Sequence, residues 1–160
     1  MQNRFNTRFI AKTAIIAAIY AALTVGLAPI SYMALQFRIS EMLILLAFIN
    51  PAFAPGLVLG TFIANLFSPL GMIDVIFGTI ATIMSLRYMM ISKNIWLASL
   101  YPTVFNGIII GAELHFVYSL PLAITILQVA AGEFVVVTLL GVPLMKALLK
   151  NKAFREKIEK

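Results

Sequence analysis

The sequence has no cysteine and a single histidine. Without cysteine the chain forms no disulfide and no thiolate metal site, and one histidine cannot build a zinc site from nitrogen ligands alone. The chain also lacks the HExxH metal motif, the GxxxxGK[ST] phosphate-binding loop and the GxSxG nucleophile motif. No cofactor or metal is therefore expected. These absences predict a binding or transport protein rather than an enzyme.

Charge is scarce as well. Only 11% of the residues are charged, against roughly a quarter in ordinary soluble domains. Hydrophobic residues make up 62% of the chain, and its mean hydropathy is +1.01. A surface of this composition would aggregate in water, so its solvent has to be lipid. The composition predicts a single transmembrane domain over residues 1–160.

Prolines divide this apolar chain into segments. Proline removes a backbone donor and restrains the residue before it, so we expect helix boundaries at Pro29, Pro51 and Pro69. The predicted fold is an all-α integral membrane bundle of six transmembrane helices. The helices are expected at about 8–28, 39–50, 56–68, 72–91, 95–120 and 121–149.

The basic residues predict the orientation of the bundle. Six crossings put both termini on one side, and eleven of the twelve Lys and Arg residues fall on that side. The positive-inside rule therefore predicts cytoplasmic N and C termini. The same distribution argues against nucleic acid as the partner of a chain with a net charge of +6. Arg38 alone falls on the outer side.

Alanines repeat along the first helix. Ala14, Ala18 and Ala22 lie four residues apart, and Ala17 and Ala21 flank them. Small residues at this spacing let helix backbones approach closely in lipid. Together these alanines spread over an arc of about 140° of the circumference, which is more than one neighbouring helix would use. Packing inside the bundle and an interface with another membrane protein both stay open.

Acidic and amide side chains gather in the outer half of the expected bundle. Glu41 and Asp74 lie at the outer ends of the second and fourth helices. Glu113 and Gln128 lie about two turns below the outer ends of the fifth and sixth. Asn106 falls on the same helical stripe as Glu113. This pattern predicts the wall of a pocket that opens to the outside.

Several of these residues also have a purely structural interpretation. Arg38 and Glu41 are three residues apart and could pair to cap the second helix. Asp74 could complement a helix dipole, and Glu133, deeper on the sixth helix, could join two helices. A carboxylate within a membrane span is by default functional, which favours ligand binding for Glu113.

Resemblance to a known family is carried by short blocks in a fixed order. They are Gln36-Phe37-Arg38-Ile39-Ser40-Glu41, Ala64-Asn65-Leu66, Gly71-Met72-Ile73-Asp74, Gly78-Thr79-Ile80-Ala81-Thr82, Asn106-Gly107, Gly111-Ala112-Glu113 and Gly132-Glu133. Over about residues 10–148 the chain resembles the QueT family. Members of this family are queuosine-precursor substrate-binding (S) components of energy-coupling-factor (ECF) transporters.

The resemblance implies a multi-pass protein of the bacterial plasma membrane with an S-component fold. Ala14, Ala18 and Ala22 would dock on the ECF transmembrane coupling subunit, and two ATPase subunits would supply the energy. Residues 29–37 would form a lid over the pocket.

The implied ligand, a 7-deazaguanine, matches the polar residues chemically. A guanine-like base presents adjacent N–H and NH₂ donors that one carboxylate can accept together, and its flat face suits aromatic side chains. The expected substrate-binding residues are Arg38, Glu41, Asp74, Asn106, Glu113, Gln128, Glu133, Tyr32 and Phe37, with Phe116 as a further stacking candidate. An S component for another vitamin, such as thiamine or riboflavin, stays an alternative. Alternatives from a different class of protein are a membrane scaffold and an intramembrane enzyme.

Overall fold

The computed structural model describes residues 7–33 and 36–159, and all the regular structure in this part of the chain is helical. Three long apolar helices are α1 (Thr7–Gly26), α5 (Met72–Ile91) and α6 (Ile95–Tyr118). A fourth runs continuously through α7 (Leu122–Glu133), the π-helical η3 (Phe134–Gly141) and α8 (Val142–Leu149). These four are long and apolar enough to cross a membrane.

Two shorter apolar segments lie between α1 and α5. The first consists of the 3₁₀ helix η1 (Ile39–Leu45) and α3 (Leu46–Ile49), and the second of η2 (Pro51–Phe53) and α4 (Ala54–Asn65). At about 2.0 Å per 3₁₀ residue and 1.5 Å per α-helical residue, each reaches roughly 20 to 25 Å, less than the ~30 Å hydrocarbon core. The structure therefore shows an all-helical membrane protein with four candidate spans. The count of six crossings stays a prediction.

Two local features of the helices differ from those expected. Pro29 does not end a helix but lies in the first turn of the short α2 (Ala28–Ser31), a position where the missing N–H of proline costs nothing. The last long helix is not uniformly α-helical, because its middle third widens into η3, which packs against η1 and α6.

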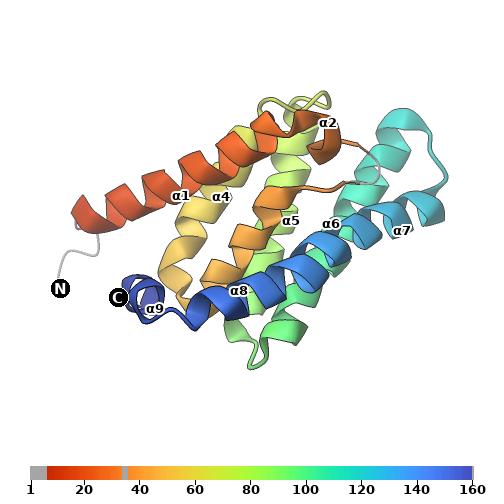
Figure 1. The fold of residues 1–160 in the computed structure, drawn as a ribbon. Coiled ribbons are helices and arrows are strands. Elements are labelled where there is room, and N and C mark those ends of the chain that lie inside the picture. The colour runs from red at the N-terminus through yellow and green to blue at the C-terminus, as the bar shows by residue number, and fades with distance from the viewer. Residues whose placement is uncertain (1–6, 34–35, 160) are drawn as a thin grey trace.

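The bundle has two distinguishable ends. Figure 1 shows the start of α1 and the final helix α9 (Lys152–Glu159) at one end, with α2 and the turn between α6 and α7 toward the other. At the first end, the Asn50 side-chain amide donates to the Ile158 carbonyl oxygen at 2.7 Å, so α9 is held against the end of α3. The assignment of this end to the cytoplasm stays the prediction made from the basic residues.

Helix α1 packs closely on α4 through two glycines. A Cβ built on Gly60 would lie 2.8 Å from the Tyr20 Cβ and 3.1 Å from the Ala17 backbone, and one built on Gly56 would lie 2.8 Å from the Thr13 carbonyl oxygen. These neighbours are backbone atoms or the first carbon of a side chain, so they cannot swing away. Backbone contact of this kind is the usual source of helix association in lipid.

We therefore expect Gly60→Ala to lower the free energy of unfolding by about 1–3 kcal/mol, because the added methyl group overpacks the α1–α4 contact. Gly26→Ala is the matched control, since a Cβ at Gly26 meets nothing within 4 Å. Denaturant titration of the two variants in one detergent measures the difference. Equal unfolding curves would show that α1 and α4 can move apart at no cost.

Candidate ligand-binding site

A cluster of buried polar side chains lies where α1, η1, α5, α6 and α7 meet. Its ionisable members are one guanidinium, Arg38, and three carboxylates, Glu41, Asp74 and Glu133; none of the four is more than 5% exposed. Glu113, a fourth buried carboxylate, lies at its edge. Charges in a membrane span are expensive unless they are paired or bind something. The partners of each side chain therefore decide what the cluster can do.

Arg38 immediately precedes η1 and turns inward. Its Nη2 lies 3.9 Å from Asp74 Oδ2, and its guanidinium carbon lies 5.6 Å from the centre of the Tyr32 ring. Burial raises the pKa of Tyr32, so its hydroxyl stays protonated and donates to the Ala64 carbonyl oxygen at 2.6 Å. The ion pair that the structure shows for Arg38 is thus with α5, and its side chain does not cap η1.

Glu41 is tied to α1. Its Oε1 accepts the hydroxyl of Tyr20, and the hydroxyls of Thr24 and Ser40 lie 2.5 Å apart in the same contact. The Arg38–Glu41 pairing considered from the sequence is replaced by these contacts between helices. Tyr20 and Thr24 were not among the residues expected here. Their spacing could have indicated this role. Tyr20 and Thr24 are three and seven residues after Ala17, so all three lie on the buried face of α1.

Glu133 joins two helices. The Asn106 side-chain amide donates to Glu133 Oε1 at 2.9 Å, which links α6 to α7. This is the structural interpretation considered for Glu133. Its other oxygen, Oε2, has no hydrogen-bond partner among the described residues, so the side chain could still accept one bond from a ligand.

Glu113 differs from the other carboxylates. It is 4% exposed, yet neither of its oxygens has a hydrogen-bond partner in the described part of the chain. It lies in the wall of a hollow of about 690 Å³ between α5 and α6, which opens on the outer surface of the bundle because Phe77 and Phe116 in its lining are exposed. The other lining residues are apolar: Ile73, Phe77, Ile80, Ile108, Ile109, Ala112, Phe116 and Val117. A lone, unsatisfied carboxylate in an apolar hollow is the arrangement that a ligand with paired donors would complete.

Taken together, the cluster has more acceptors than donors. Among the described residues, unpartnered acceptors are found on Glu41, Asp74, Glu113 and Glu133, whereas the guanidinium of Arg38 supplies the unpartnered charged donors. Buried polar atoms are normally satisfied, and each exception asks for an explanation. A ligand that brings several N–H groups and a positive charge would satisfy this site best.

Two expected residues lie outside the cluster. Phe37 is half-buried and packs against the main apolar core of the bundle. Gln128 is exposed. The face that α7 buries carries Thr125, Val129 and Gly132, and Gln128 lies at the edge of that face, about 40° from Gly132 around the helix. The prediction that Gln128 lines the pocket is therefore not supported by its position.

A glycine lets the segment before Arg38 approach α7. A Cβ on Gly132 would lie 2.2 Å from the Gln36 carbonyl oxygen, so only glycine permits this crossing. The crossing fixes residues 36–38 against α7 and so directs Arg38 toward Asp74. Gly132 and Gln36 thus help to place Arg38. In the sequence, Gly132 was noted only as part of a family motif.

Comparison with known proteins agrees with this geometry. The model of the QueT transporter family matches residues 10–150. The chain belongs to the QueT transporter family. A curated relative, the queuosine precursor transporter QueT of Lactococcus lactis subsp. cremoris (strain MG1363), is 35% identical over 137 residues, which cover 76% of this chain and 80% of the relative. No solved structure matches the chain.

Membership of a transporter family decides the class of protein. With its apolar helices, this QueT family member is a multi-pass protein of the bacterial plasma membrane, and it is a transporter and not an enzyme.

The alanines of α1 separate into two sets. Ala17 and Ala21 are buried in the bundle, whereas Ala14, Ala18 and Ala22 are exposed on the adjoining face of the helix. The packing inside the bundle that the sequence left open therefore applies to the first set. The second set is available to a neighbour in the membrane.

Proposed function

We propose that this chain is the substrate-binding S component of an ECF-type transporter and that it imports a queuosine precursor of the 7-deazaguanine type. Two facts support the substrate: the family to which the chain belongs, and the identity of its relative, a queuosine precursor transporter. The structural observation that carries the proposal is Glu113, a buried carboxylate without a partner among the described residues in an otherwise apolar hollow.

The hollow suits a flat heterocycle chemically. A guanine-like edge presents two adjacent N–H donors, which the two oxygens of Glu113 can accept side by side. Phe77 and Phe116 line the same hollow and offer aromatic faces for the ring. Asp74 and Arg38 are close enough to Glu113 to interact with it electrostatically, and they can bind substituents of the ring.

A separate energy source is part of the proposal. The sequence carries no P-loop of its own, so import driven by ATP requires other subunits that hydrolyse it. We propose an ECF transmembrane coupling subunit and two ATPase subunits. The exposed face formed by Ala14, Ala18 and Ala22 supports a close contact between this chain and the coupling subunit.

Calorimetry on the purified full chain tests the ligand. We expect 7-aminomethyl-7-deazaguanine to bind, and 7-cyano-7-deazaguanine to bind more weakly, because the site has spare acceptors and the amine brings further donors and a positive charge. Thiamine and riboflavin serve as comparison ligands. Binding of either vitamin without binding of a deazaguanine would overturn the substrate and leave the membrane fold untouched. A chain that binds none of the four is not an S component for these ligands.

The coupling face has its own test. Ala18→Trp should reduce uptake of the ligand in cells to the level of cells that lack the ATPase subunits, because the bulky ring blocks close helix approach. Ligand binding by the isolated variant should stay normal, since Ala18 is exposed and lies outside the cluster. Ala123→Trp on the exposed surface of α7 is the matched control and should leave uptake intact. Normal uptake by Ala18→Trp would remove α1 from the interface.

A further inference from the structure

A second hollow lies between α4 and α5, away from the carboxylate cluster. Its volume is about 570 Å³, and most of its lining is apolar: Ala54, Pro55, Val58, Leu59, Phe62, Ile83, Leu86 and Met90, with Thr79 and Arg87 as the polar members. The proposed substrate does not use it. Several of its side chains, among them Leu59 and Ile83, are more than 40% exposed, so the hollow is a groove on the outer surface of the bundle.

The length of the groove matches one leaflet of a bilayer. From Thr79 to Met90, α5 rises by roughly 16 Å at about 1.5 Å per residue. Half of a hydrocarbon core of about 30 Å is about 15 Å. An acyl chain of one leaflet therefore fits alongside these two helices.

The single charge in the groove lies toward one end. Arg87 is exposed and is four residues from the end of α5 at Ile91, after which the chain turns through Ser92–Asn94. No ion pair is found for Arg87 among residues 7–33 and 36–159. An arginine at this depth can extend its guanidinium to the headgroup level. Phosphate is an anion that lipids supply at this level, and its geometry matches the two-pronged donor set of a guanidinium.

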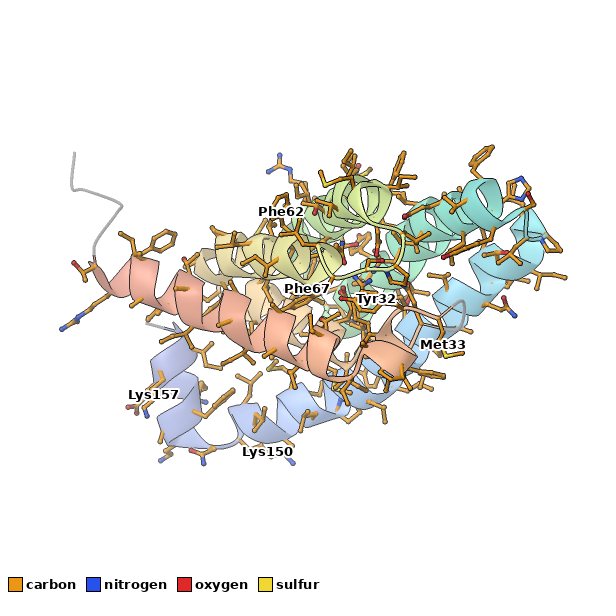
Figure 2. The ribbon with its side chains drawn as sticks, turned by 90° about the horizontal axis from the view of Figure 1, so that it is seen from above. Tyr32, Met33, Phe62, Phe67, Lys150 and Lys157 are labelled. Carbon is orange, nitrogen blue, oxygen red and sulfur yellow. The ribbon has the colours of Figure 1, made fainter. Side chains whose placement is uncertain are left out.

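We propose that the α4–α5 groove is a binding site for an anionic phospholipid, with one acyl chain along the groove and the phosphate on Arg87. Basic pockets between membrane helices commonly hold anionic headgroups. The site is distinct from the basic residues after α8: Figure 2 labels Phe62 on the groove side of α4 and Lys150 and Lys157 on the opposite side of the molecule.

Two lipids with identical chains test the proposal on the full chain in detergent. Native mass spectrometry should show dioleoylphosphatidylglycerol retained about 5-fold more strongly than dioleoylphosphatidylcholine, which is the effect of about one basic residue near a headgroup. Phosphatidylglycerol should also raise the melting temperature more than phosphatidylcholine does. Equal retention of the two lipids by the wild-type chain would overturn the proposal without the need for any variant.

Three variants locate the site. Arg87→Gln should abolish the preference for phosphatidylglycerol, and Val58→Phe should reduce retention of both lipids by filling the groove. Lys150→Gln removes the same charge elsewhere and should keep the preference. If Lys150→Gln weakens the preference as much as Arg87→Gln does, the attraction comes from net charge and the groove is not a lipid site. If phosphatidylglycerol leaves both measurements unchanged while the purified coupling subunit protects the groove from labelling, the occupant is a protein and the proposal is wrong.

Discussion

Glu113→Gln should weaken the binding of a 7-deazaguanine by roughly 30- to 1,000-fold. Glutamine keeps the shape of the side chain but replaces one acceptor with an N–H donor that faces a donor of the ligand. Losing a charge-assisted bond and leaving a buried ligand N–H unpaired costs about 2–4 kcal/mol. Calorimetry of the wild-type chain and the variant measures the loss.

The melting temperature of the same variant separates binding from structure. Glu113 has no hydrogen-bond partner in the described part of the chain, so neutralising it should leave stability unchanged or raise it. Glu133→Gln is the matched control, because a glutamine oxygen can still accept the bond from Asn106. It should bind the ligand better than Glu113→Gln does. Normal affinity in a destabilised Glu113→Gln would make Glu113 a structural residue.

Arg38→Met should be the most destabilising of these substitutions. It removes the guanidinium that lies 3.9 Å from Asp74 and leaves a carboxylate that is 1% exposed without its counter-ion. Breaking one side of a buried ion pair typically costs about 3–5 kcal/mol. The free energy of unfolding from a denaturant titration measures the effect.

Two further variants make the Arg38 result specific. Arg38→Lys keeps the charge but loses the planar fork and its stacking on Tyr32, so an intermediate loss is expected. Lys152→Met removes an exposed charge on α9 and should change the unfolding free energy by no more than about 0.5 kcal/mol. If Arg38→Met and Lys152→Met have the same free energy of unfolding, the stability of the cluster does not depend on Arg38, and the charge of Asp74 is compensated in another way.

The residue types of the site were predictable from the sequence, but several of their partners were not. Because charge is rare in this chain, the intramembrane carboxylates could be predicted as site residues. Glu41, Asp74, Glu113 and Glu133 are indeed buried, as is Arg38. The sequence favoured Glu113 for ligand binding and allowed a helix-to-helix bond for Glu133, but it did not identify Asn106 as the partner of Glu133. Glu133 is bonded to Asn106 and Glu113 is not, although both lie within apolar helices. That difference depends on which helices face each other.

Tyr20 and Gln128 show that the sequence did not predict which way a helix faces. Tyr20 belongs to the cluster but was not predicted there, and Gln128 was predicted there but is exposed. Tyr20 looked like part of an alanine-rich helix, yet it donates to Glu41, because α1 packs beside η1. Gln128 looked like a pocket residue from its depth, yet it is exposed, because α7 buries the neighbouring face. Depth along a helix follows from counting residues, but the direction around the helix depends on its neighbours.

The sequence by itself determined the solvent, the helical class and the family of this protein. An apolar chain must satisfy its backbone internally in lipid, which leaves helices as the local solution, and the motif blocks are short and contiguous. Only the tertiary structure decided that Arg38 pairs with Asp74, that Glu113 stands without a partner beside a hollow, and that the alanines of α1 divide into an inner and an outer set. These are contacts between segments distant in the chain. They depend on the packing angles of whole helices, which local sequence patterns do not encode.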